Sequence, residues 1–250
     1  MSQASVGFHC PECLAAKRAP SRSVIGRPGA GEPVVTKALI GINLAVAVLA
    51  AMFGGGRNFG PGEWIIRYGL HGWAVDSLGE WYRIVTSAFL HDGIVHLGLN
   101  LWALWMIGPF LERPFGRLRF TALVGCSLVG GAFGVLLLDP LALTIGASGV
   151  VFGLFGAVAV VQRSAGIDLW RSGIGSLLLV NLLFTFLIPS VSVGGHVGGL
   201  FAGSAVAAWF VAMQRARQPD WLATLVAAGF AVLLFSGSLW AASNWANPLF

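Results

Sequence analysis

The sequence predicts an all-α protein that crosses a membrane several times. Only 10% of the residues are charged and 56% are hydrophobic, whereas a soluble domain usually carries about 25% charged residues. Several stretches without Asp, Glu, Lys or Arg reach about 20 residues, the length of a membrane-spanning helix. These observations exclude an ordinary soluble protein, a disordered chain and a basic nucleic-acid-binding domain, so no nucleic-acid partner is expected.

Seven apolar stretches are predicted to be membrane-spanning helices. They cover residues 38–56, 93–111, 120–138, 140–162, 172–188, 193–213 and 221–240. The fifth and sixth belong to one apolar run that is too long for a single span, and the turn-rich segment at 189–195 divides it. The count of seven predicts that the two ends of the chain lie on opposite sides of the membrane.

The positions of the basic residues predict the orientation of the chain. With a cytoplasmic N-terminus, twelve of the fifteen Lys and Arg residues lie in cytoplasmic segments, and Arg57, Arg67 and Arg83 lie outside. Cytoplasmic loops of membrane proteins carry such an excess of positive charge. We therefore expect a multi-pass protein of the plasma membrane with a cytoplasmic N-terminus and an external C-terminus.

The connection between the first two spans, residues 57–92, is long and aromatic. It contains Trp64, Tyr68, Trp73, Trp81 and Tyr82. Trp and Tyr suit the membrane interface because each has an apolar body and a polar tip. The loop is expected to pack on the interface or dip into it, and long structured loops are often functional.

Two polar residues open predicted spans and are candidates for a reactive pair, because polar side chains inside a membrane are costly. Ser148 opens the fourth span within Gly146-Ala147-Ser148-Gly149, and His196 opens the sixth after Gly194-Gly195. Both are expected near the outer ends of their spans, and this equal depth favours a serine nucleophile with a histidine base. The structural alternatives are a serine bonded to its own helix and a buried neutral histidine.

His96 and Asn100 lie four residues apart, on one face of the second span. Their side chains could stabilise a developing negative charge, or they could join two helices by a hydrogen bond. Phe152 lies on the same face of its helix as Ser148 and could orient the imidazole of His196 by stacking. These spans contain no carboxylate, so a Ser–His dyad is a simpler prediction than a triad.

Taken together, these segments resemble the rhomboid family of intramembrane serine proteases. The resemblance rests on Gly146-Ala147-Ser148-Gly149, on His96-x-x-x-Asn100, and on His196-Val197-Gly198-Gly199-Leu200-x-x-Gly203. The loop segment at 80–91 and Gly108-x-x-x-Glu112-x-x-x-Gly116 add to it. The resemblance runs from about residue 35 to 214 of the sequence. It implies a six-helix catalytic core at 34–214 with its active site below the outer membrane surface, followed by a connector and an extra helix at 215–250.

The resemblance also implies roles for single residues. Ser148 would be the nucleophile, His196 the general base, and His96 and Asn100 donors to the oxyanion, while Phe152 would pack against His196. Further residues would support this site: Gly146 beside the nucleophile, Gly199 and Gly203 where the sixth helix packs on the fourth, and Arg83, His91 and Glu112, which would hold the long loop and its neighbours in shape. One departure is Tyr82-Arg83, where the family usually has Trp-Arg.

The implied function is cleavage of single-span membrane proteins within the bilayer. The alternative is an inactive rhomboid-like protein that binds membrane clients without cleaving them. Such relatives typically lack the serine or the histidine, whereas Ser148 and His196 are both present. A transporter would carry charged or broken helices at the bilayer midplane, whereas the polar residues here gather near one end of their spans.

The segment at 1–33 contains Cys10 and Cys13, a Cys-x-x-Cys pair that is half of a zinc site. A half-site without metal is the preferred interpretation, because His9 is adjacent to Cys10 and Cys126 lies in the third span. No other cofactor is expected. The segment resembles the end of a zinc-binding module found on some bacterial, especially actinobacterial, rhomboids, and one hypothesis is that the assigned start codon is internal. Residues 14–33 are a basic linker rich in Pro and Gly.

Overall fold

The computed structural model describes residues 2–3, 8–9, 31–53 and 62–244. Two short strands, β1 (Ser2–Gln3) and β2 (Phe8–His9), pair antiparallel near the N-terminus. The other described elements are helices, so the prediction of an all-α membrane protein is confirmed. The predictions for Cys10, Cys13 and most of the linker fall outside the described residues.

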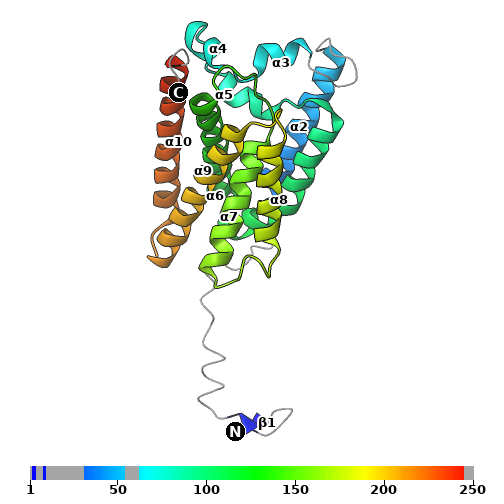
Figure 1. The fold of residues 1–250 in the computed structure, drawn as a ribbon. Coiled ribbons are helices and arrows are strands. Elements are labelled where there is room, and N and C mark those ends of the chain that lie inside the picture. The colour runs from blue at the N-terminus through cyan, green and yellow to red at the C-terminus, as the bar shows by residue number, and fades with distance from the viewer. Residues whose placement is uncertain (1, 4–7, 10–30, 54–61, 245–250) are drawn as a thin grey trace.

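Six long helices form the bundle shown in Figure 1. They are α2 (Val34–Phe53), α6 (Gly93–Leu138), α7 (Ser148–Ser164), α8 (Ile174–Leu187), α9 (Val193–Arg215) and α10 (Asp220–Ser243). Helix α6 has two arms, because Gly116 has a φ of 77° and interrupts it. The two arms correspond to the second and third predicted spans, so the long helices of the described chain form seven segments where seven were predicted.

The prediction for the fourth span was wrong at its start. A helix from residue 140 was expected, but α7 begins at Ser148. The amide of Gly72 donates to the Pro140 carbonyl at 2.6 Å, and Thr144 pairs with Leu70 as an isolated β-bridge. The apolar segment at 140–147 therefore packs against the long loop and does not begin a helix. Helix α7 starts only after this segment, at Ser148.

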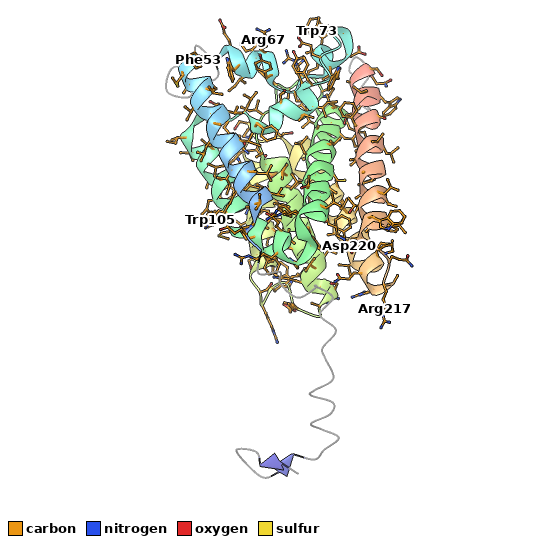
Figure 2. All side chains as sticks on the ribbon, turned by 180° about the vertical axis from the view of Figure 1, so that it is seen from behind. Phe53, Arg67, Trp73, Trp105, Arg217 and Asp220 are labelled. Atoms are coloured by element: carbon orange, nitrogen blue, oxygen red, sulfur yellow. The ribbon has the colours of Figure 1, made fainter. Side chains whose placement is uncertain are left out.

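Four of the described helices are long and apolar enough to cross a membrane, namely α2, α6, α9 and α10. Helices α7 and α8 are apolar but have only 17 and 14 residues. Large apolar side chains cover the outside of the bundle, and Trp105 is 66% exposed there. Figure 2 shows Arg67 and Trp73 at one end of the bundle and Arg217 and Asp220 at the other. This arrangement fits a multi-pass membrane protein.

The long loop forms a layer of short helices across one end of the bundle (Figure 1). They are α3 (Glu63–Tyr68), α4 (Gly72–Ser77), α5 (Arg83–Thr86) and the 3₁₀ helix η1 (Ser87–Phe89). Arg83 is buried and fastens this layer, since its guanidinium donates to the Ile66 and Gly69 carbonyls at 2.7 and 2.8 Å and pairs with Glu80 at 2.6 Å. This agrees with the expected supporting role of Arg83.

The main core lies where both arms of α6 meet α7 and α9, with side chains such as Phe120, Leu154 and Phe210 fully buried. A smaller core joins the loop layer to the second arm of α6 and to α10. There the rings of Trp81 and Phe235 meet edge to face at 6.4 Å. Helix α10 thus packs on α6 and also supports the loop layer.

Candidate active site

The start of α7 is shaped by a glycine in a conformation that other residues rarely adopt. Gly146 has a φ of 116°, and its amide donates to the Ser87 carbonyl at 2.9 Å, which ties the turn to η1. A Cβ atom at Gly146 would lie 2.8 Å from Cε1 and Nε2 of His96 and 3.8 Å from Oγ of Ser148. The His96 ring and the Ser148 hydroxyl therefore both lie close to the position that this Cβ atom would occupy. The absence of a side chain at Gly146 thus leaves room for the His96 ring, and its role beside Ser148 stays a prediction.

Ser148 is the first residue of α7, so its backbone amide is among those without a carbonyl partner in the helix. Free amides at a helix start carry partial positive charge and can hold an anion. A hydroxyl at this place has donors beside it that could stabilise an oxyanion formed by attack on a carbonyl.

Glycines bring α7 and α9 into backbone contact. A Cβ atom at Gly199 would collide with the Gly149 carbonyl, and one at Gly203 would collide with the Gly153 carbonyl. Small residues at this spacing let membrane helices approach closely. The predicted packing of the sixth helix on the fourth through Gly199 and Gly203 agrees with these contacts, and it holds the first turns of α7 and α9 together.

His196 lies in the first turn of α9 and has two neighbours. Its ring stacks on Phe152, with the centroids 4.0 Å apart and the planes at 17°. Its Nδ1 lies 2.7 Å from Oγ1 of Thr185 on α8. The side chain of Ser192, the N-cap of α9, accepts the Gly195 amide at 3.1 Å and so fixes the turn that carries His196. The expected stacking of Phe152 on His196 is therefore present.

His96 and Asn100 lie on the first arm of α6, one turn apart. The side-chain amide of Asn100 donates to the His96 carbonyl at 2.9 Å, which leaves its second N–H for another acceptor. Asn100 is 5% exposed. The ring of His96 contacts the ring of His91 edge to face, with the centroids 5.0 Å apart. The role of both residues as oxyanion donors stays a prediction.

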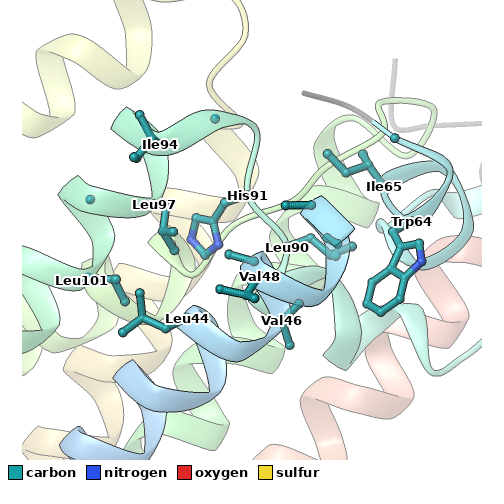
Figure 3. Close-up of a pocket in the computed structure, with 16 residues that line it drawn as sticks. Leu44, Val46, Val48, Trp64, Ile65, Leu90, His91, Ile94, Leu97 and Leu101 are labelled. Carbon is teal, nitrogen blue, oxygen red and sulfur yellow. The ribbon is translucent and has the colours of Figure 1, made fainter. Parts of the chain in front are cut away.

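Burial, together with the neighbouring His96, lowers the pKa of His91 to about 4 from the ordinary 6.5, and the Phe89 carbonyl opposes this shift. His91 is therefore neutral at pH 7. Its ring also faces a cavity of about 310 Å³ between α2, α3 and the start of α6 (Figure 3). The cavity lining is apolar apart from His91 and includes Leu44, Val48 and Leu97, but neither Ser148 nor His196.

Glu112 is buried in α6 and binds the start of α2. Its carboxylate accepts the backbone amides of Val35 and Thr36, both at 2.8 Å, and the Thr36 hydroxyl at 2.7 Å. A negative charge at a helix N-terminus is favourable because the free amides there carry partial positive charge. Glu112 thus joins α6 to the start of α2, whereas the resemblance implied a role in holding the long loop.

Sequence reasoning did not single out Thr185. It lies in α8, four residues after Asn181, and two polar residues one helical turn apart among large apolar neighbours were the available signal. Within the described ranges, no group of three or more His, Cys, Asp or Glu side chains is placed to hold a metal ion.

Comparison with known proteins identifies the family. The model of the Rhomboid domain matches residues 78–215, more than half of the sequence. The chain therefore belongs to the rhomboid family.

The similar proteins include some that are named proteases and one that is named inactive. Rhomboid protease GluP from Bacillus subtilis (strain 168) is 32% identical over 181 residues, which cover 71% of this chain and 35% of the relative. YdcA from the same organism is 33% identical over 141 residues, 55% of this chain and 70% of the relative. Inactive RHOMBOID-like protein 8 from Arabidopsis thaliana is 33% identical over 140 residues, 54% of this chain and 39% of the relative. The chain thus spans about a third of GluP.

Proposed function

We propose that this protein is an intramembrane serine endopeptidase in which Ser148 is the nucleophile and His196 the general base. The observation that carries the proposal is the stacking of His196 on Phe152. Phe152 follows Ser148 by four residues, so the two side chains share one face of α7. The ring of His196 is consequently held on the face of α7 that carries the Ser148 hydroxyl, which supports a Ser–His pair.

In the proposed reaction, Oγ of Ser148 attacks the carbonyl carbon of the scissile peptide while His196 accepts the hydroxyl proton. His196 then gives this proton to the leaving amine. A water molecule next attacks the acyl carbon while His196 accepts its proton, and His196 returns a proton to Oγ of Ser148 as the carboxyl product leaves. The Ser148 amide, His96 and Asn100 donate hydrogen bonds to the tetrahedral oxyanion. Loss of one such donor usually costs about 3–4 kcal/mol of transition-state stabilisation.

The proposed substrates are single-span membrane proteins. The apolar exterior of the bundle faces lipid, so a substrate helix can reach the site laterally. A helix must unwind locally before its carbonyl becomes available, so helix-breaking residues near the cut should assist cleavage.

We further propose a plasma-membrane location with a cytoplasmic N-terminus, on the basis of the distribution of Lys and Arg. The start of α2 and the end of α10 lie at opposite ends of the bundle, as this topology requires (Figure 1).

The Cys10–Cys13 pair enters the proposal only as half of a zinc site. A closed site needs about four ligands. Its remaining ligands would have to come from elsewhere. The zinc content of the purified protein, compared with that of a Cys10→Ser variant, tests whether this pair binds zinc.

The proposed activity is tested by cleavage of a reporter membrane substrate by the purified protein in proteoliposomes. Wild type should cleave, and Ser148→Ala and His196→Ala should lose cleavage while remaining folded. Thr224→Val on α10 is a control, because Thr224 is only partly buried and its hydroxyl donates to the Asp220 carbonyl within its own helix. Cleavage by Ser148→Ala would overturn the mechanism. A folded wild type that binds several substrates but cleaves none would favour the client-binding alternative, which the similarity to an inactive relative keeps open.

A further inference from the structure

A single hydrogen bond connects α8 to the histidine of the candidate dyad. Thr185 is the one residue of α8 that is fully buried, with 1% of its surface exposed. Its Oγ1 lies 2.7 Å from Nδ1 of His196 and 2.8 Å from the backbone carbonyl of Asn181. A buried hydroxyl with two partners at these distances makes both hydrogen bonds.

The protons of this pair of hydrogen bonds can be assigned. A threonine hydroxyl has one proton to donate, and the Asn181 carbonyl can only accept. The hydroxyl proton therefore lies on the line to Asn181. The second hydrogen bond must then run from Nδ1–H of His196 to the oxygen of Thr185. In a neutral imidazole with a proton on Nδ1, the lone pair is on Nε2.

We propose that Thr185 is a positioning residue that holds His196 in the Nδ1–H tautomer and turns Nε2 toward Ser148. This inference rests on the proposed Ser–His mechanism, in which the base needs a free lone pair facing the serine hydroxyl. Thr185 then does the orienting work that a carboxylate does in a Ser-His-Asp triad.

The two neighbours of His196 restrain different motions of its ring. Stacking on Phe152 fixes the plane of the imidazole but permits a half-turn of the ring about the Cβ–Cγ bond, which keeps that plane. The hydrogen bond to Thr185 selects one of the two orientations, because it requires Nδ1 rather than Cδ2 beside Oγ1. No carboxylate contacts His196 in the described part of the chain, so the hydroxyl is the polar group that selects the tautomer there.

The tautomer can be measured without any assay of cleavage. Nitrogen-15 NMR of the ring nitrogens distinguishes N–H from lone-pair nitrogen, and a His196→Gln sample assigns the signals. Wild type at neutral pH should show a protonated Nδ1. The same result is expected in Ser148→Ala, because the hydrogen bond does not depend on the nucleophile. A protonated Nε2 in wild type would overturn the proposal, and this measurement needs no variant of Thr185.

Two variants test whether the hydroxyl sets the tautomer and the rate. Thr185→Val keeps the shape but removes the hydroxyl, and it should populate the Nε2–H form. Its kcat should fall about tenfold to hundredfold, as for other residues that orient a catalytic group, and its KM should change little. Thr185→Ser restores the hydroxyl and should retain the wild-type tautomer and most of the activity. Thr224→Val, which loses a similar hydroxyl on α10, should behave like wild type.

The outcomes separate this inference from the proposed function. If wild type cleaves nothing but its Nδ1 is protonated and becomes unprotonated in Thr185→Val, the positioning role holds and the protease proposal fails. If wild type cleaves and Thr185→Val keeps both the tautomer and kcat, the positioning role fails alone. Equal impairment of Thr185→Ser and Thr185→Val would also contradict it, because the hydroxyl would not be the active feature.

Discussion

The helix pair α7–α9 and the single helix α8 contribute to the same candidate site in opposite ways. Helices α7 and α9 are in backbone contact through glycines, and most of α7 is buried. Helix α8 buries only Thr185 and turns large side chains such as Phe186 and Leu187 outward. Lipid is as apolar as Leu, so moving an apolar side chain from lipid into a helix interface brings no hydrophobic gain. Tight association of membrane helices depends instead on small residues that let the backbones approach.

This difference in packing indicates that the pair α7–α9 and the helix α8 have different roles in the site. The pair α7–α9 fixes the distance between the chain segments that carry Ser148 and His196. Helix α8 reaches His196 through one hydrogen bond, which depends on where α8 lies. A displacement of α8 would therefore release the ring of His196 without separating α7 from α9.

The largest combined loss of stability and cleavage is expected when the close packing of α7 on α9 is disrupted. Gly199→Ala places a methyl group against the Gly149 carbonyl, and backbone cannot move aside as a flexible side chain can. Overpacking of this kind costs about 3 kcal/mol, and cleavage should be lost with it. Thermal unfolding in detergent and the reporter assay measure both effects.

Gly229→Ala on α10 is the matched control, because a Cβ atom there meets nothing within 4 Å. It should leave the stability unchanged or raise it by up to about 1 kcal/mol, since Ala is the better helix former. Equal behaviour of the two variants would contradict the close packing of α7 and α9.

A pair of leucine truncations compares how firmly α7 and α8 are packed, with stability alone as the readout. Leu154 of α7 is fully buried, and Leu154→Ala should cost about 2–5 kcal/mol through the cavity that it leaves. Leu183 of α8 is 51% exposed, and Leu183→Ala should change the free energy of unfolding by less than about 0.5 kcal/mol. Denaturation by SDS from mixed micelles compares the two. A large loss from Leu183→Ala would show that α8 is packed more firmly than its exposure indicates.

The smallest effect concerns His91, which lies just before the first arm of α6 and whose ring contacts that of His96. With a pKa of about 4 in the folded protein, His91 binds its proton more weakly than the ordinary 6.5 of an unfolded chain. The contribution of His91 to the free energy of unfolding is therefore fully present above about pH 6.5 and is lost as the pH falls toward 4. One pKa unit corresponds to about 1.4 kcal/mol, so His91 accounts for a loss of about 2 kcal/mol at pH 5.

His91→Gln keeps a neutral polar side chain and should make the unfolding temperature less sensitive to acid. The measurement is the difference in unfolding temperature between pH 7 and pH 5 for the two proteins. An identical loss in both would show that other groups cause the acid sensitivity.

Much of the fold could be predicted because the bilayer imposes simple constraints. Apolar length located six of the seven long helical segments to within a few residues, and the resemblance to the rhomboid family implied that α9 packs on α7. The start of α7 was missed because an apolar segment can pack on a loop as well as span a membrane. Only the positive φ of Gly146 and the contacts of Pro140 and Thr144 reveal that difference.

The candidate site was predictable in part. Ser148, His196 and Phe152 were found by their positions on helices, and the ring stacking of the last two is now described. Thr185 was missed because a threonine in an apolar helix commonly bonds to its own backbone, and it does so here as well. Its second hydrogen bond depends on how α8 lies against α9, which no pattern within residues 174–187 records.

The most direct test of the central claim is to map the site of a fluorophosphonate adduct by mass spectrometry. Such reagents react with a serine that an adjacent base activates. The account predicts one adduct on Ser148 in wild type, strong loss of labelling in His196→Ala, and no effect of Thr224→Val. An adduct on another residue, or undiminished labelling of Ser148 in a folded His196→Ala protein, would contradict the Ser148–His196 dyad.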